Sequence, residues 1–259
     1  MHTTENDAAG SSGPGAPSVV VIAAMAEEAA AFAAFATDPP TEPVSGAPWF
    51  VTVNGAHVAL VRSGIGFTNA TIAAARCFHL FGSTVPMISI GSAGGLAADV
   101  ELGDVVVGRD YVNLNADATV FGYRIGQVPG MPERYAADTR LVDQALQAVV
   151  PFRVRPHVIG SSEVFVADER ARALREVFPD VGAVDMESAA IAQFAHVHDV
   201  PFVSVRGISD LCAPTGEQFR THLDDAADRA ARVAVDLVTA RQGTLTTTHD
   251  HVGTPGGPL

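Results

Sequence analysis

Short β-branched runs alternate with Ala-rich stretches along most of this chain, and no other feature constrains the fold as much. Residues 18–24 (SVVVIAA) predict a buried strand, and residues 27–36 (EEAAAFAAFA) predict the helix after it. Strands that are apolar throughout are buried on both faces, as in a parallel sheet covered by helices. The pattern therefore predicts an α/β fold.

The same alternation continues to about residue 240. Further strands are expected at 57–63, 87–93, 103–112, 156–162 and 201–210, and further helices at about 67–80, 168–178 and 217–240. Because no repeat or linker interrupts this order, residues 18–240 are predicted to form a single domain around a central mixed, mostly parallel sheet. Residues 1–17 and 241–259 have too few apolar side chains to bury a core, and we expect disordered tails there.

Charge and cysteine usage narrow the possible partners. The chain has 29 acidic residues against 16 Lys and Arg, a net charge of −13. Since an acidic surface repels phosphate backbones and anionic lipids, we expect no nucleic-acid or membrane partner, but a neutral small molecule is not deterred. Glu27 and Glu28 break the first apolar run, so we expect no signal or membrane segment there. Cys77 and Cys212, far apart in the chain, fit a reducing cytoplasm.

Three acidic residues lie where predicted strands end or helices begin: Glu28, Glu187 and Asp210. Taken singly, each has a structural explanation, because the helix dipole favours a carboxylate at a helix start and Asp often caps a helix. Ligands of open α/β sheets, however, bind beyond the carboxyl ends of the strands, where all three would meet. Glu27 and Glu28 are adjacent and point different ways, so one of them can face a site while the other is solvated.

Glu187 and Arg206 both need partners if they are buried. Glu187 begins an apolar helix in 184–195 (VDMESAAIAQFA), where an unpartnered carboxylate would be costly, so the fold or a substrate must satisfy it. Arg206 lies in a mostly apolar strand and cannot lose its charge. A structural salt bridge explains its position as well as a ligand site does.

Two glycine-rich segments follow other strands. Residues 91–95 (GSAGG) would let backbone N–H groups approach a ligand, or would merely form a tight turn. Residues 63–69 (SGIGFTN) begin like a dinucleotide-binding fingerprint, but Asn69 occupies the third glycine position. A Rossmann-type cofactor site is therefore disfavoured.

Eight motifs together suggest a family. They are AAMAEE, SGIG, SIGSAGGL, GDVVV, ADATVFGYRIGQVPGMP, SSEVFV, AVDMESAAIA and PFVSVRGISD. In this order and spacing they resemble the nucleoside phosphorylase/nucleosidase superfamily over about residues 18–240, and more closely the bacterial 5'-methylthioadenosine/S-adenosylhomocysteine nucleosidases. The resemblance implies hydrolysis of the N-ribosidic bond of these nucleosides, in methionine salvage, by a homodimer without a metal or organic cofactor.

The resemblance also implies three catalytic acids. Glu28 matches the acid that polarises the attacking water, Asp210 the general acid that protonates N7 of the purine, and Glu187 the acid that binds the ribose hydroxyls. Cleavage passes through a cationic sugar that carboxylates stabilise, and adenine leaves poorly as an anion. Glu28 must therefore be ionised while Asp210 carries a proton.

The remaining matches are to substrate-binding positions. They are Ser92, Arg206 and Ser209 as polar groups near the water and the acid, Phe165 as the ring that stacks on adenine, Val166 as the backbone that reads the purine edge, Met186 against the sugar, and Met25, Ile65 and Phe219 around the 5' substituent. Phe121 and Pro129 match residues that the family lends to the neighbouring pocket across a dimer.

Two segments depart from the family pattern. Leu114-Asn115 stands where the family commonly has His-Asp, and Ser162-Glu163 stands where it usually has Gly-Asp. The chain is also shorter by one residue after Asp210. These changes are expected near the adenine and the 5' substituent, so another 5'-modified purine nucleoside, in a specialised pathway, is an alternative substrate.

Two other functions compete with hydrolysis. A purine nucleoside phosphorylase must hold a phosphate dianion, which Glu27 and Glu28 would repel and only Arg206 would attract. A non-catalytic nucleoside-binding protein would bind adenine nucleosides without cleaving them, and the complete set of acids argues against it.

Overall fold

The structure, a computed structural model, describes residues 16–39, 47–212 and 217–249, and in the last range it describes the side chains of 220–241. The strands are β1 (Val19–Ala23), β2 (Trp49–Val53), β3 (Ala56–Arg62), β4 (Met87–Gly95), β5 (Val105–Asn113), β6 (Tyr135–Ala136), β7 (Val154–Ser161), β8 (Val181–Asp185) and β9 (Phe202–Asp210). The helices are α1 (Ala26–Ala33), α2 (Phe67–Phe81), α3 (Thr139–Leu146), α4 (Asp168–Val177), α5 (Ser188–His198) and α6 (Glu217–His249), with a 3-10 turn η1 (Thr119–Phe121). In these ranges no helix has the length and apolar character needed to cross a bilayer.

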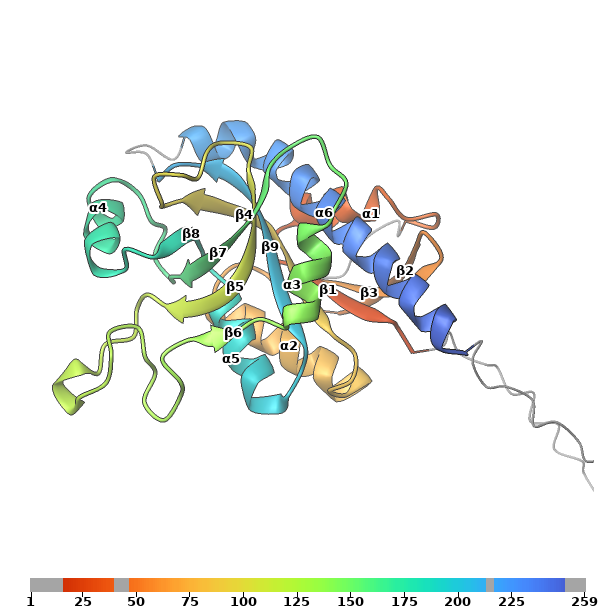
Figure 1. Cartoon of the computed structure of the whole chain (residues 1–259), viewed down its shortest axis with the longest axis horizontal. Coiled ribbons are helices and arrows are strands. Elements are labelled where there is room, and N and C mark those ends of the chain that lie inside the picture. The colour runs from red at the N-terminus through yellow and green to blue at the C-terminus, as the bar shows by residue number, and fades with distance from the viewer. Residues whose placement is uncertain (1–15, 40–46, 213–216, 250–259) are drawn as a thin grey trace, which may run out of the picture.

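All of these strands belong to one mixed sheet (Figure 1). The pairs β1–β3, β1–β4, β4–β9, β5–β7 and β7–β8 are parallel, and the pairs β2–β3, β4–β8, β5–β6 and β5–β9 are antiparallel. The prediction of a mixed, mostly parallel sheet is therefore confirmed.

Part of the sheet closes on itself. β4 pairs with β9, β9 with β5, β5 with β7, β7 with β8, and β8 pairs back onto the end of β4. These five strands form a ring, and β1, β3 and β2 extend from it. Closure brings the carboxyl ends of β4, β8 and β9 to one place, although β8 runs antiparallel to β4.

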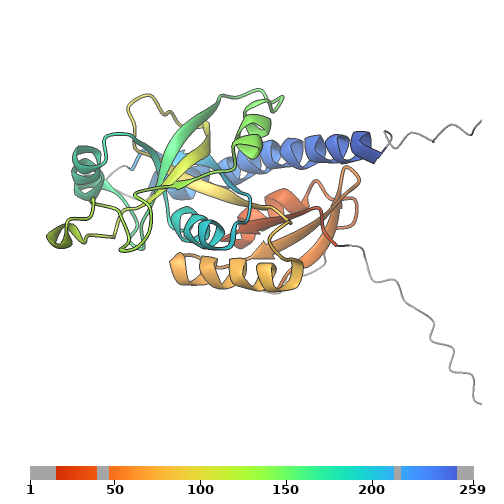
Figure 2. The ribbon, with the colours of Figure 1, turned by 60° about the horizontal axis from the view of Figure 1, so that its bottom comes forward.

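Helices cover both faces of the sheet. α1, α3 and α6 lie on one face, where Phe32, Leu141 and Val233 are fully buried (Figure 2). α2 and α5 lie on the other face and bury small side chains, such as Ala74 and Ala192, which let these helices pack closely against the strands. Apolar area buried in both layers stabilises the fold by roughly 25 cal/mol per Å².

Every strand and helix predicted from the sequence is present, and five further elements, β2, β6, β8, α3 and the turn η1, are not among the predictions. β2 and β6 are short and gain their order from antiparallel pairing with β3 and β5, which periodicity does not reveal. α3 has one clear local signal, because the side chain of Asp138 accepts a hydrogen bond from the Leu141 N–H at 3.0 Å and so caps the helix.

The closing helix differs at its end. α6 continues to His249, beyond the predicted helix end at about residue 240. No proline interrupts the helix there, and a single glycine costs only about 1 kcal/mol. The disordered tail expected from residue 241 stays a prediction. Residues 1–15 and 250–259 of the predicted tails lie outside the described part of the chain.

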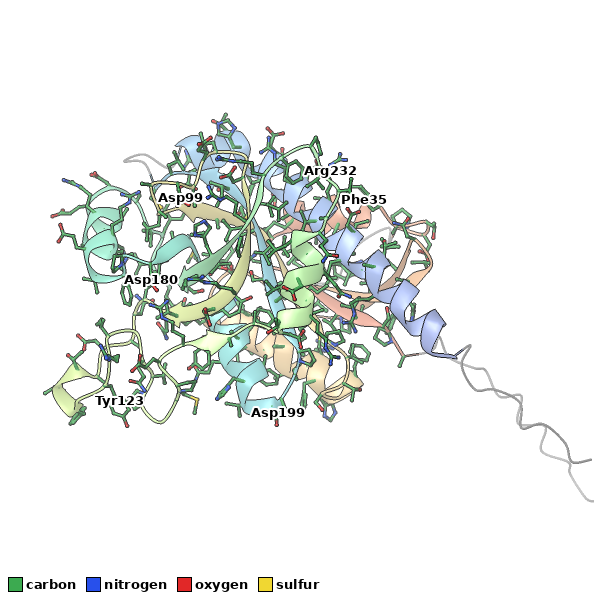
Figure 3. All side chains as sticks on the ribbon, in the orientation of Figure 1. Phe35, Asp99, Tyr123, Asp180, Asp199 and Arg232 are labelled. Carbon is green, nitrogen blue, oxygen red and sulfur yellow. The ribbon has the colours of Figure 1, made fainter. Side chains whose placement is uncertain are left out.

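A long loop between β5 and β6 projects from the body of the molecule. It carries η1, and Tyr123 lies near its far end (Figure 3). Val120 and Phe121 on this turn are 83% and 80% exposed. The base of the loop is closed by the Gly126 N–H, which donates to the Ala116 carbonyl at 2.8 Å.

Candidate active site

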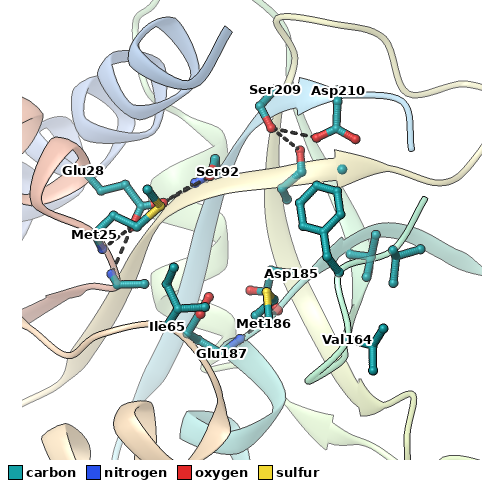
Figure 4. A pocket seen from close by; sticks show the side chains of 16 residues that line it. Met25, Glu28, Ile65, Ser92, Val164, Asp185, Met186, Glu187, Ser209 and Asp210 are labelled. Carbon is teal, nitrogen blue, oxygen red and sulfur yellow. Dashed lines mark hydrogen bonds between the residues drawn. The ribbon is translucent and has the colours of Figure 1, made fainter. Parts of the chain in front are cut away.

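A cavity of about 170 Å³ opens at the carboxyl ends of β1, β4, β8 and β9. Ten of the predicted site residues line it: Met25, Glu28, Ile65, Ser92, Phe165, Val166, Met186, Glu187, Ser209 and Asp210. Glu28 and Asp210 approach from opposite sides, with Glu187 below them (Figure 4). The three acids therefore share one cavity although they lie far apart in the sequence.

Glu28 is the buried member of the adjacent acid pair, while Glu27 is exposed. One carboxylate oxygen of Glu28 accepts from the backbone N–H groups of Ala24 and Met25, each at 3.0 Å. The other accepts from the Ser92 N–H at 2.9 Å and the Ser92 hydroxyl at 3.2 Å. Four donors around one carboxyl suit its ionised form, which only accepts hydrogen bonds.

Gly91 provides the space that Glu28 occupies. A Cβ atom at this position would lie 2.4 Å from Glu28 Oε1 and 2.5 Å from Arg206 Nη1, closer than packed atoms allow. The glycines of 91–95 therefore do more than form a turn. At Gly91 the missing side chain lets an acid and a guanidinium approach the same stretch of backbone.

Asp210 ends β9 and is 5% exposed. One of its oxygens accepts from the Cys212 N–H at 2.8 Å, and the other lies 3.0 Å from the Ser209 hydroxyl. The same hydroxyl lies 3.3 Å from the Ala93 carbonyl. Since a serine hydroxyl has one proton, Ser209 can donate either to Asp210 or to Ala93, and in the second case it can accept a hydrogen bond from a protonated Asp210.

Glu187 is buried and has protein partners on both oxygens. Oε1 accepts from the Gly66 N–H at 3.0 Å, and Oε2 lies 3.7 Å from Arg206 Nη2. Burial, together with the nearby carboxylates of Asp185 and Glu28, raises the pKa of Glu187 to about 8, although Arg206 and the Gly66 N–H oppose this shift. The pairing with Arg206 is long, so Oε2 can accept hydrogen bonds from a ligand.

Arg206 lies behind the cavity and does not line it, unlike the prediction that it contacts substrate. Its Nε is 2.7 Å from Asp185 Oδ2, and its Nη2 is 2.8 Å from the Ser89 hydroxyl. Burial lowers the pKa of Arg206, but the carboxylates of Asp185, Glu187 and Glu28 together raise it above its ordinary value. The physical reason for the difference is that Asp185 takes the guanidinium as its own buried partner.

Apolar side chains form the rest of the wall. Met25 and Ile65 lie on the side of Glu28 and Glu187, and Met186 lies at the floor (Figure 4). Phe165 lines the cavity with 44% of its surface exposed, and Ile65 does so with 49% exposed. Large apolar residues that line a cavity and face solvent mark its mouth.

Besides Arg206, two of the predicted residues, Phe121 and Pro129, do not line the cavity. Both lie on the projecting loop and are exposed. The side chain of Phe219 lies outside the described residues. The expectation that Phe121 and Pro129 serve a neighbouring subunit stays a prediction.

Six lining residues are missing from the sequence-based set: Ala24, Ala93, Gly94, Val164, Val184 and Asp185. Asp185 accepts from the hydroxyls of Ser161 and Ser188 and from the Ser188 N–H. Its place at the end of a buried strand, beside the predicted Glu187, is the signal that could have identified it. The other five contribute small or aliphatic surface, which no sequence pattern distinguishes from core.

Comparison with known proteins decides the family. A family model of the phosphorylase superfamily matches residues 18–239. A 5'-methylthioadenosine/S-adenosylhomocysteine nucleosidase from Marinomonas sp. (strain MWYL1) is 39% identical over 217 residues, which cover 82% of this chain and 94% of that protein. The chain belongs to this nucleosidase family.

Solved structures of the nucleosidase family agree with the fold. The crystal structure of the Neisseria meningitidis nucleosidase in complex with methylthio-immucillin-A has a TM-score of 0.80 and 34% identity, and the match covers 86% of this chain and 98% of that one. The S. pneumoniae nucleosidase with the transition-state inhibitor MT-ImmA has a TM-score of 0.79 and 30% identity, over 86% of this chain and 98% of that one. The expected family and fold are both confirmed.

Proposed function

We propose that this protein hydrolyses the N-ribosidic bond of 5'-methylthioadenosine and S-adenosylhomocysteine, releasing adenine and the 5'-substituted ribose. The observation that carries the proposal is the convergence of Glu28, Glu187 and Asp210 on one cavity. Family membership supports the same substrates, because the relatives are named for them.

In this proposal Glu28 is the general base. Its four hydrogen-bond donors hold the carboxylate in place and suit the ionised form that accepts a proton from water. Ser92 supports the same oxygen and lines the cavity, so its hydroxyl can help to orient the water. The negative charge of Glu28 also stabilises the positive charge that develops on the sugar.

Asp210 is the general acid in this proposal. A proton delivered to N7 lets adenine leave as a neutral molecule, and Asp210 approaches the cavity from the side opposite Glu28 (Figure 4). Ser209 supports this role, because its hydroxyl reaches both Asp210 and the Ala93 carbonyl and can accompany either protonation state.

Glu187 holds the ribose. Two neighbouring hydroxyl groups can donate to its carboxylate, which supplies the partners that a buried charge requires. Since the pKa of Glu187 is about 8 without a ligand, binding of a diol to the ionised carboxylate should release a proton at neutral pH. Met186 lies beside Glu187 at the floor of the cavity, where it can contact the sugar ring.

The apolar wall accommodates the two ends of the nucleoside. Phe165 provides a ring on which adenine can stack, and the backbone beside Val166 can read the purine edge. Met25 and Ile65 lie near Glu28 and Glu187, where a 5'-thio substituent would extend from the ribose. Phe219 stays a candidate for the same end of the substrate.

The charge of the cavity favours water over phosphate as the nucleophile. Its described lining contains four carboxylates, those of Glu28, Asp185, Glu187 and Asp210, and no Lys or Arg side chain. Arg206 is occupied by Asp185 and Ser89. A phosphate dianion in this position would meet repulsion with little compensation.

We further propose that the active form is a cytoplasmic homodimer that acts in methionine salvage. Phe121 and Pro129 would each contact the substrate pocket of the neighbouring subunit. The projection of their loop and the high exposure of Val120 and Phe121 support a partner on this surface. Cys77 and Cys212 are both free thiols, which supports a reducing compartment.

A product assay tests the proposal. The purified protein is incubated with methylthioadenosine, S-adenosylhomocysteine, 5'-deoxyadenosine and adenosine, each with and without phosphate, and free adenine and the sugar product are quantified. We expect phosphate-independent release of adenine, fastest from the two 5'-thio nucleosides. Dependence on phosphate with formation of a ribose 1-phosphate would identify a phosphorylase, and binding without cleavage would identify a non-catalytic protein.

A further inference from the structure

Two chain segments form opposite sides of the cavity mouth. One is the turn 64–66 before α2, which carries Ile65, and the other is the segment 162–166 after β7, which carries Phe165. Both residues line the cavity and are about half exposed. The separation of these two segments therefore determines how tightly a nucleoside is enclosed.

Glu163 joins the two segments. Its Oε1 accepts a hydrogen bond from the Phe67 N–H at 2.7 Å. The contact requires a small residue beside it, because a Cβ atom at Gly66 would lie 2.9 Å from Glu163 Oε2. The preceding N–H, that of Gly66, donates to Glu187. Two consecutive N–H groups at the start of α2 are thus held by two carboxylates, one in the catalytic cavity and one at its mouth.

The start of α2 has no cap of its own. Its N-cap residue is Gly66, no side-chain capping bond is made there, and its first turn contains no acidic residue. The first N–H groups of a helix lack partners within the helix and attract negative charge. Glu163 supplies that charge from the Phe165 segment, so the same bond that caps α2 also closes one side of the cavity.

Asn115 holds Glu163 from the other side. Its Oδ1 accepts from the Glu163 N–H at 2.8 Å, and its Nδ2 lies 3.4 Å from the Ser162 hydroxyl. That hydroxyl also lies 3.2 Å from Arg170 Nη2. Asn115, Ser162 and Glu163 are among the residues that depart from the family pattern, and here they contact one another.

We propose that Glu163 is a positioning residue that ties the Phe165 segment to the start of α2 and thereby sets the affinity for the nucleoside. Glu163 acts at two places. It keeps Phe165 in position to stack on adenine, and it keeps the Gly66 N–H in position to donate to Glu187. Binding then costs less conformational entropy, because the two sides of the mouth are already at the spacing of the complex. The inference rests on the proposed function, since Phe165 and Glu187, the two residues that Glu163 positions, both bind the nucleoside in that proposal.

The test compares Glu163→Ala with Asp138→Ala. Asp138 caps α3 through the Leu141 N–H and does not line the cavity, so its loss reproduces the helix-capping effect alone. For adenine release from methylthioadenosine we expect Glu163→Ala to raise KM about three- to tenfold, the size of one charge-assisted hydrogen bond at a partly exposed site, with kcat within about twofold. Asp138→Ala should lower the melting temperature without changing KM.

Two further variants keep the test decisive. Glu163→Gln keeps an oxygen that can accept from Phe67 but loses the charge, so its KM should lie between those of the wild type and Glu163→Ala. Asn115→Ala combined with Glu163→Ala should raise KM no more than Glu163→Ala alone. If Glu163→Ala fails to fold, the Glu163→Gln value decides.

An unchanged KM in the Glu163 variants would overturn the inference and leave Glu163 as a helix cap. That result differs from failure of the proposed function, in which the wild-type protein itself would release no adenine. If the wild-type protein releases no adenine, calorimetric titration with adenine measures the affinity of the wild type and of Glu163→Ala instead. Equal affinity of wild type and Glu163→Ala for adenine would again overturn the inference.

Discussion

The guanidinium Nε of Arg206 lies 2.7 Å from Asp185 Oδ2, in an ion pair that solvent scarcely reaches. Asp185 ends β8 and Arg206 lies in β9, so the pair joins two strands of the closed ring. Serine hydroxyls complete the cluster, since Ser89 and Ser188 both contact the guanidinium. The pair stabilises the part of the structure next to Glu187, and it accounts for the position of Arg206 behind the cavity wall.

Replacing Arg206 with Met should destabilise the protein by about 3–5 kcal/mol, because the change leaves Asp185 as an unpaired buried charge. Urea unfolding measures the loss. Arg172→Met is the matched control, since Arg172 makes an exposed pair with Asp168 at 3.3 Å and should leave the urea midpoint nearly unchanged. Similar midpoints for the two variants would show that the buried pair carries no special weight.

Glu28→Gln should lower kcat by about 10²–10⁴-fold, because an amide cannot take a proton from water. Glu27→Gln, one position earlier, removes the same charge from an exposed side chain and should retain activity. Steady-state release of adenine measures both. Comparable losses in the two variants would point to overall charge instead of a specific base.

Asp210→Asn should nearly abolish turnover while leaving nucleoside binding measurable, because only the transition state needs the proton that Asp210 supplies. We expect kcat to fall by at least about 10²-fold. Single-turnover kinetics and calorimetric titration with methylthioadenosine separate the two effects. A variant that keeps near-wild-type kcat would exclude Asp210 as the general acid.

Glu187 should make the free protein less stable as pH rises. In the unfolded chain this carboxyl loses its proton near its ordinary pKa of 4.5, whereas in the folded protein it keeps the proton until about pH 8. Its stabilising contribution is therefore complete below pH 4.5 and is lost progressively between pH 4.5 and about 8.

Glu187→Gln removes this titration, and unfolding in urea at several pH values tests it. From pH 5 to pH 9, we expect the variant to gain stability relative to the wild type, by about 4 kcal/mol. The change of this stability difference with pH is diagnostic, because other effects of the substitution on the free energy of unfolding do not vary with pH. Parallel stability curves would contradict a raised pKa of Glu187.

Phe121→Ala should raise KM about tenfold if the loop completes a neighbouring pocket. Val120→Ala is the control, because Val120 lies on the same turn with similar exposure. Mixing Phe121→Ala with Asp210→Asn subunits should restore a low-KM activity, since one pocket of each mixed dimer then has both Asp210 and Phe121. A proven dimer whose mixtures show no such recovery would argue against a shared pocket.

Much of the fold could be predicted because local pattern and burial agree. The strands β1, β4 and β9 are apolar over most of their length, and the helices α1 and α2 follow strands at the expected places. The strands β2, β6 and β8 and the short α3 are not among the predicted elements. Their order comes from contacts with distant segments, or from a single capping residue, and neither produces a long periodic pattern.

The sequence by itself determined the α/β class, the family, and three of the four acids that line the cavity, Glu28, Glu187 and Asp210, because these depend on residue types in a fixed order. Only the tertiary structure decided which partners those acids have. In the folded protein Arg206 pairs with Asp185 behind the cavity, and Asn115 contacts Glu163. Glu163 accepts a hydrogen bond from the N–H of Phe67, the first residue of a helix 96 residues earlier in the chain. The physical reason is that burial, hydrogen-bond partners and charge neighbours are set by how the closed sheet brings remote strand ends together, and no local pattern records that arrangement.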